Sequence, residues 1–426
     1  MKSLKATFTQ GLILCSILST IIACEWIEIP NRHPIPYRGD IFNPNNHRQK
    51  PDSTTEKTIL IDHLYQAWVS YPENYDWIRD AEHGTIECFL TMTCDEDTLI
   101  HSPIGPEYGI SADASSHRII NGHLYTDCIV GNSTIISEDG QRLFSTPERE
   151  KVHSMLLYNN QLHTLSISQG QKSIIYRVDG QEVLRQDNSN IIRGLYLDND
   201  HILFSYRLNV NPQKTEFHFV HDGIDQIILT PLTSEIVIDM LQCQGSRYIL
   251  TNNTQSEDYY LYENDQRQSL ILLKREKIQS AKLISYNKNI LVMGQIYDGS
   301  YYSINIWNKT KLMFCLYNNS YLLKTFSQNN RLGLLYLENN QDEEDATIAL
   351  LHIDYNPMTI PDIVIATDIP YYIDEKNLII GVNRQDGLLP TLISTKTQQA
   401  KTEDFNGYYT ALEIVTTEEK LSDQSD

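Results

Sequence analysis

Basic residues are scarce in this chain of 426 residues, which carries 34 lysines and arginines against 55 aspartates and glutamates, a formal net charge of -21. Proteins bind phosphate backbones and anionic lipid headgroups mainly through Lys and Arg, which displace counterions. The composition therefore argues against a nucleic-acid-binding protein and against adhesion to an anionic lipid surface.

Motifs of common enzyme chemistry are absent as well. The sequence contains no G-x-G-x-x-G or P-loop for nucleotides, no H-E-x-x-H for zinc, no C-x-x-C, and no G-x-S-x-G nucleophile elbow. We therefore expect no cofactor and no metal, and we assign no catalytic residue. A site assembled from distant segments would leave no motif of this kind.

Long hydrophobic runs are missing except near the start of the chain. Residues 11–22 (GLILCSILSTII) are uncharged and mostly apolar, and they follow Lys2 and Lys5. This layout is typical of a secretory signal, whereas a helix that spans a bilayer needs roughly 20 apolar residues. The pattern therefore predicts a signal peptide rather than a permanent membrane span.

The run ends on Ile21-Ile22-Ala23-Cys24, which resembles the lipobox of bacterial lipoproteins. The resemblance implies that residues 1–23 are cleaved and that Cys24 is acylated, and several acyl chains anchor a protein stably. An ordinary secretory signal with a chance cysteine is the alternative. Glu25 and Glu28 resemble the acidic stretch that directs lipoproteins of the Bacteroides group to the outer membrane. We expect a lipid-anchored outer-membrane protein, either at the cell surface or on the periplasmic face.

Cysteine is sparse once Cys15 and Cys24 are set aside. Five remain, namely Cys88, Cys94, Cys128, Cys243 and Cys315. In one straight strand the first two of these would be about 20 Å apart, and a disulfide needs Cα atoms within roughly 7 Å. A bridge from either one to Cys128 is sterically easier, and we consider a Cys94–Cys128 disulfide. Free buried thiols are the alternative.

Helical spacing of apolar residues is scarce too, and a β pattern takes its place. Apolar or alternating runs recur about every eight to twelve residues, separated by Asn, Asp, Gly and Gln. A longer period of about 38 to 46 residues is typical of propeller blades. It is marked by predicted turns between first and second strands near Gly122, Asn160, Asp200, Gly245, Lys288, Asn330 and Lys376.

These repeats predict an all-β fold, a β-propeller of about seven four-stranded blades, with six or eight blades also open. Strands within residues 58–114, with a late strand near Tyr408, would complete an eighth blade or close the ring by mixing the two ends of the chain. A two-sheet sandwich competes, but it does not explain the long period. The repeats resemble those of bacterial propeller lipoproteins in strand order and turn composition, without the motif of a particular propeller family.

The domain organisation follows from composition. Residues 24–57 are rich in Pro, Asn and charge and predict a flexible tether. We place the propeller at residues 58–417 and a polar tail at residues 418–426.

Few side chains suggest a site. His218 and His221 are three apart in a predicted strand and should point to opposite faces, so we expect them not to share a metal. The acidic runs 95–97 and 342–345 lack the spacing of a calcium loop. Loops between second and third strands meet at one mouth of a propeller, where aromatic and guanidinium groups suit a glycan or an anionic peptide. Five residues lie near such ends, namely Arg207, Tyr259, Tyr301, Tyr336 and Arg384.

Three functions remain open. The first, which we favour, is a monomeric, non-catalytic envelope protein that binds a glycan or a protein. The second is a scaffold subunit of an envelope complex, which predicts a contiguous exposed apolar patch. The third is a glycan lyase or hydrolase, which needs at least two titratable groups within reach of one substrate atom.

Overall fold

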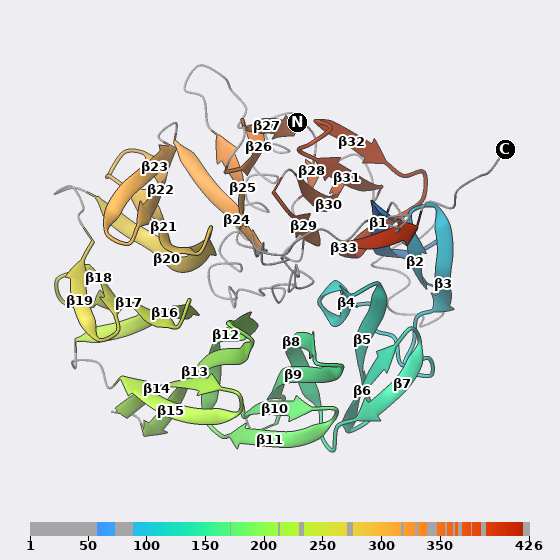
Figure 1. The fold of residues 1–426 in the computed structure, drawn as a ribbon, viewed down its shortest axis with the longest axis horizontal. Coiled ribbons are helices and arrows are strands. Elements are labelled where there is room, and N and C mark those ends of the chain that lie inside the picture. The colour runs from blue at the N-terminus through green and yellow to red at the C-terminus, as the bar shows by residue number, and fades with distance from the viewer. Residues whose placement is uncertain are drawn as a thin grey trace, which may run out of the picture.

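The computed structural model describes residues 58–72, 88–170, 172–211, 214–229, 234–270, 276–316, 319–328, 331–338, 347–353, 356–360, 363–364, 369–375, 377–384 and 389–420. These residues form eight antiparallel sheets arranged as a ring (Figure 1). The fold is an eight-bladed β-propeller, which confirms the predicted architecture. Each blade has an innermost strand near the axis of the ring and an outermost strand at its rim (Figure 1).

Consecutive hairpins build blades 2 to 4, from the inner strand outward. A short 3-10 helix, η1 (Ala114–Ser116), leads into blade 2. The strands are β4 (His117–Ile120), β5 (His123–Val130), β6 (Ser133–Glu138) and β7 (Gln141–Ser145) in blade 2; β8 (Glu150–Tyr158), β9 (Gln161–Ser168), β10 (Ile174–Val178) and β11 (Gln181–Gln186) in blade 3; and β12 (Ser189–Asp198), β13 (His201–Asn211), β14 (Lys214–His221) and β15 (Ile224–Leu229) in blade 4.

Blades 5 to 8 continue the same order. Blade 5 contains β16 (Glu235–Cys243), β17 (Ser246–Asn253), β18 (Tyr259–Glu263) and β19 (Gln266–Ser269), and blade 6 contains β20 (Lys277–Tyr286), β21 (Asn289–Tyr297), β22 (Tyr302–Asn308) and β23 (Lys311–Leu316). Blade 7 contains β24 (Ser320–Gln328), β25 (Arg331–Glu338), β26 (Thr347–His352) and β27 (Met358–Ile360). In blade 8, β28 (Ile363–Val364) and β29 (Tyr371–Ile373) both pair with β30 (Leu378–Arg384), which is followed by β31 (Pro390–Ser394) and β32 (Gln399–Thr402).

The two ends of the described chain share blade 1. Its inner strand is the late strand β33 (Gly407–Lys420), and its outer strands are β1 (Thr58–Ser70), β2 (Phe89–Cys94) and β3 (Asp97–Pro103). β1 and β33 pair antiparallel from Thr58↔Lys420 to Ser70↔Gly407. The expected closure by mixed ends is confirmed, and the ring has eight blades rather than about seven. β33 ends at Lys420, beyond the boundary expected at residue 417.

The predicted turns between first and second strands are confirmed where the structure describes them, at Gly122, Asn160, Asp200, Gly245 and Lys288. In each of these turns both central residues have positive φ, for example 46° at Asn287 and 61° at Lys288. Two-residue loops of this kind match the twist of a hairpin, and Asn, Asp and Gly tolerate the conformation. The turns expected near Asn330 and Lys376 lie outside the described residues.

The core lies between neighbouring blades, where facing sheets bury their side chains against each other. One cluster joins blade 4 to blade 6 through Tyr196, Leu250 and Trp307, all buried. A single blade cannot bury both faces, so the ring is stable only when its blades stack.

The outermost strands carry one extra residue in several blades. The pairing of β3, β7, β11 and β23 with their neighbours skips Leu99, Leu143, Val183 and Met313, and all four side chains are exposed. Such bulges interrupt the free edge of a sheet and oppose pairing with another chain.

The predictions for the first 57 residues and for residues 421–426 concern parts of the chain outside the described residues. They comprise the signal peptide, the acylated Cys24, the tether and most of the tail. In the part of the chain that the structure describes, no helix is long and apolar enough to cross a bilayer.

Candidate functional site

A side-chain arrangement recurs on the face of the ring that carries the turns between first and second strands. After the third strand of blades 1 to 4 comes an aspartate with φ of 47° to 53°. Its backbone N–H donates to the carbonyl of a residue in the second strand, at 2.8 to 2.9 Å. Its carboxylate accepts the N–H of the same residue, and the four pairs are Asp95 with Leu64, Asp139 with Leu124, Asp179 with Leu162, and Asp222 with Ile202.

Three of these four blades add a histidine directly before that second-strand residue. The Nδ1 atoms of His63, His123 and His201 lie 2.9, 2.7 and 2.7 Å from the second carboxylate oxygen of their aspartates. Blade 3 has Gln161 in this place. We call the arrangement in blades 1, 2 and 4 a His corner. Blade 3 closes the same turn without a histidine, so formation of the turn does not explain why the other three blades have one.

A third side chain comes from the residue before the aspartate and differs among the corners. It is Cys94 in blade 1, Glu138 in blade 2 and His221 in blade 4. In blades 1 and 4 the three potential ligand atoms lie within 4.8 Å of one another. In blade 2 the hydroxyl of Tyr125 donates to Glu138 at 2.8 Å, and the closest approach of Glu138 to His123 is 3.9 Å.

The blade 4 corner contains two imidazoles and a carboxylate. The Nδ1 of His221 lies 3.5 Å from the Oδ2 of Asp222, and the rings of His201 and His221 have centroids 4.3 Å apart. The side chains are 46%, 33% and 43% exposed for His201, His221 and Asp222. The corner therefore opens to solvent.

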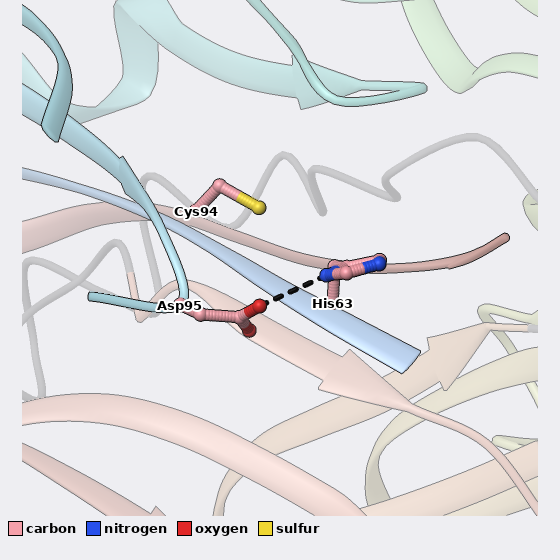
Figure 2. Close-up of side chains that lie close together, drawn as sticks. All are labelled: His63, Cys94 and Asp95. Atoms are coloured by element: carbon pink, nitrogen blue, oxygen red, sulfur yellow. Dashed lines mark hydrogen bonds and ion pairs between the residues drawn. The ribbon is translucent and has the colours of Figure 1, made fainter. Parts of the chain in front are cut away.

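The blade 1 corner also takes part in ring closure. Figure 2 shows Cys94 and Asp95, at the end of β2, reaching toward His63 on β1. The other ring nitrogen of His63 lies 3.0 Å from the hydroxyl of Thr417 on β33. This histidine thus links the closing strand to the third strand of its blade.

The corners shift the ionisation of their members. The hydrogen bond from His63, with the Leu64 N–H, lowers the pKa of Asp95. Partial burial acts to raise the pKa of Asp222, but the Ile202 N–H and His201 outweigh it and the pKa is lowered. In blade 2 the hydrogen bond with Asp139 raises the pKa of His123. Imidazole and carboxylate groups gathered in this way suit proton exchange or binding of a transition metal.

The five residues predicted to bind a ligand lie in five blades, from blade 4 to blade 8. Tyr259 and Tyr336 are only 8% and 2% exposed and pack in inter-blade cores, so neither presents a free aromatic face at the surface. Arg207 is exposed on β13, and Tyr301 is 45% exposed in the loop before β22. Arg384 ends β30, and its side chain lies outside the described part.

The disulfide considered between Cys94 and Cys128 is absent, because both are free thiols. Cys94 ends β2 of blade 1, whereas Cys128 is buried in β5 of blade 2, so the two belong to different sheets. Cys88, Cys243 and Cys315 form no disulfide either.

His218 and His221 point to different environments, as the strand alternation predicts. His218 is buried, stacks on Tyr206 with centroids 4.6 Å apart, and lies 3.1 Å from Asp225. His221 joins His201 and Asp222 instead. Sequence reasoning missed this trio because its members belong to β13 and to the end of β14. The signal in the sequence is a histidine at the start of the second strand, His201, followed by His221-Asp222-Gly223 at the end of the third.

Buried charges on the inner strands join blades. Arg118 of β4 lies 3.1 Å from Asp127 and donates to the carbonyl of Val152 in blade 3 at 3.1 Å. Arg193 of β12 pairs with Asp239 of blade 5, and its guanidinium donates to the carbonyl of Leu283 in blade 6 at 2.9 Å. The ion pairs satisfy buried charge. The links between blades are the bonds from Arg118 to Val152 and from Arg193 to Asp239 and Leu283.

No family model matches the chain, and no curated protein matches it in sequence. Among solved structures it is similar to a dihydro-heme d1 dehydrogenase, NirN, at 10% identity and a TM-score of 0.49, over 82% of this chain and 74% of that one. It is similar to the β-propeller domain of the Trilobed protease from Pyrococcus furiosus, at 12% identity and a TM-score of 0.44, over 68% and 98%.

A third similar structure is a prolyl endopeptidase, at 8% identity and a TM-score of 0.43, over 71% of this chain. The match spans about half of that protein, 51% of its chain. These likenesses concern the fold alone.

Proposed function

We propose that this eight-bladed propeller is a membrane-anchored, non-catalytic binding protein of the bacterial envelope. Lipid on Cys24 would hold it at the outer membrane, at the cell surface or on the periplasmic face, and the ring would present its loops to a glycan or a protein. The lipobox-like residues before Cys24 support the anchor. The net charge of -21 supports a partner other than nucleic acid.

The main support for a non-catalytic function is that the arginines of the inner strands are buried in ion pairs. The pairs Arg118–Asp127 and Arg193–Asp239 are buried, and each arginine also donates to a backbone carbonyl of another blade. A general acid or base must reach substrate with a free position for the proton. Because Arg118 and Arg193 bond to carboxylates and to other blades, these charges of the inner strands favour a rigid binding ring over a catalytic centre at its axis.

The ligand would meet the face opposite the His corners, where second strands lead into third strands. Tyr301 is exposed there, in a turn that Asp298 stabilises by accepting the N–H groups of Ser300 and Tyr301 at 2.8 Å. An exposed tyrosine on an ordered turn offers an aromatic face at low entropic cost.

The anchor is tested in cells, and the ligand is tested with purified protein. In cells labelled with a fatty-acid analogue, we expect the parent to take up label and remain in the membrane fraction, and Cys24→Ala to lose both. Label on Cys24→Ala equal to the parent would contradict the anchor.

With purified protein, a thermal-shift screen against envelope glycans should raise the melting temperature, since a ligand that binds the native state stabilises it. Tyr301→Ala should lose the shift, whereas Tyr108→Ala, exposed to a similar 47% on another loop, should keep it. A shift that both variants retain would contradict the role of Tyr301. No shift with any glycan would contradict a glycan ligand and favour a protein partner.

A scaffold subunit is the second candidate, and the apolar rim favours it. Leu99, Leu143 and Val183 are exposed on the outermost strands of three consecutive blades, and Ile224 and Ile227 continue the series in blade 4. Co-purification of an envelope protein that is lost in a Leu99→Glu, Leu143→Glu variant would favour this function.

A further inference from the structure

We propose that the blade 4 corner, formed by His201, His221 and Asp222, is a binding site for a transition-metal ion of the zinc class. It lies on the opposite face from the proposed ligand loops and does not depend on the proposed function. The chemistry of the three side chains is that of a two-histidine, one-carboxylate site with open positions.

The geometry is close to what such an ion needs. Bonds of about 2.0 to 2.1 Å in a tetrahedral arrangement place donor atoms roughly 3.3 Å apart. The Oδ2 of Asp222 lies 2.7 Å from the Nδ1 of His201 and 3.5 Å from the Nδ1 of His221. One of these two distances is shorter and the other longer than the separation of about 3.3 Å between tetrahedral donor atoms. Small side-chain rotations would therefore bring the three donors into position around the ion.

The carboxylate is already oriented for this role. The Oδ1 of Asp222 accepts the N–H of Ile202 at 2.8 Å, and this bond leaves Oδ2 facing both imidazoles. Outer hydrogen bonds of this kind fix metal ligands in place. The turn also anchors the carboxylate, because the Asp222 N–H donates to the Ile202 carbonyl at 2.9 Å.

His221 is the residue that distinguishes this corner from a turn-closing pair. Blade 3 closes the same turn with Asp179 and no histidine, and blade 2 does so with His123 and Asp139. Only blade 4, among the described corners, places a second imidazole against the pair. Nitrogen donors with a single carboxylate favour zinc, nickel or copper over calcium, which takes six to eight oxygen ligands.

The test is Zn²⁺ titration of the purified protein by calorimetry. All variants carry Cys94→Ser, so that the thiol of the blade 1 corner does not bind the metal in its place. We expect the Cys94→Ser parent to bind Zn²⁺ at micromolar concentration. Removing an outer-shell partner costs roughly 10- to 100-fold in metal affinity, so His221→Ala, which removes a direct ligand, should weaken this binding at least 10-fold.

The matched control is His123→Ala at the blade 2 corner, which should leave the affinity unchanged. Because His221 is partly exposed and closes no turn, His221→Ala should keep the parent's urea midpoint, and this separates loss of a ligand from loss of fold. Equal Zn²⁺ binding by the parent and His221→Ala would overturn the proposal. So would the absence of binding by the parent.

Discussion

At the scale of single residues, the same side chain takes opposite roles according to its place on a blade. His117 and His153 lie on the inner strands β4 and β8 and are buried, and burial lowers the pKa of each to about 4. His123 lies at an exposed corner, where Asp139 raises its pKa. Burial disfavours the charged imidazole, whereas a carboxylate partner favours it.

This contrast predicts opposite responses to pH. The folded-state pKa of His153, about 4, is below the unfolded value of 6.5, so the unfolded chain binds more protons between these values. Its neutral burial therefore costs stability as the pH falls from 6.5 toward 4, by about 2 kcal/mol at pH 5. In urea unfolding at pH 7.5 and pH 5, His153→Gln should lose less stability on acidification than the parent.

His123→Gln is the control of opposite sign. Because the folded pKa of His123 is raised, its contribution is fully present below the unfolded pKa and is lost as the pH rises through the folded value. This variant should therefore be more destabilised at pH 5 than at pH 7.5. Burial raises the pKa of Asp127 to about 6, although Arg118 opposes the shift. This carboxyl group therefore makes the protein less stable as the pH rises, and it does so equally in the parent and in both variants. Parallel pH dependence of the parent and His153→Gln would contradict the role assigned to His153.

At the scale of elements, the hairpin turns set the shape of each blade, and some of them also touch the next blade. Gly140 and Gly180 occupy equivalent turns between third and fourth strands, with φ of 78° and 79°. A Cβ atom at Gly140 would meet open space, whereas one at Gly180 would lie 2.8 Å from the ring of Phe144 in the preceding blade. The backbone requires glycine-like freedom at both turns, but packing between blades requires it only at Gly180.

Alanine at these two positions should separate the two effects. Gly140→Ala should cost about 1 kcal/mol, the strain of a left-handed residue. Gly180→Ala should cost about 1 to 3 kcal/mol more, because the new methyl group overpacks the contact with Phe144. Urea midpoints measure both, and Phe144→Leu in the Gly180→Ala background should recover part of the difference. Equal losses for the two glycines would show that the contact between blades contributes nothing.

At the scale of the whole molecule, the ring is closed by residues from opposite ends of the described chain. β33 pairs with β1 along Thr58 to Ser70, and Glu413 of β33 accepts the N–H groups of Asn121 and Gly122 in blade 2 at 3.1 and 2.7 Å. This buried carboxylate ties the closing strand to the next blade. The ring is thus closed by the pairing of β33 with β1 and by the hydrogen bonds from blade 2 to Glu413.

Glu413→Ala should therefore loosen the closed ring. Loss of two hydrogen bonds to a charged, buried acceptor costs about 2 to 4 kcal/mol. Glu418→Ala, an exposed position on the same strand, should change the free energy of unfolding by less than about 0.5 kcal/mol. Urea unfolding measures the two variants. If they lose the same stability, the bond across the blade boundary does not hold the ring closed.

The β class, the blade period and the turns at Asn160, Gly245 and Lys288 could be predicted from the amino-acid sequence. These follow from local chemistry, because strand alternation and positive φ depend on residues that are neighbours in the chain. The tertiary structure alone decided the count of eight blades, the burial of Tyr259 and Tyr336, and the meeting of His201 with His221. Each of these depends on strands that are distant in sequence and brought together only when the blades pack and the ring closes.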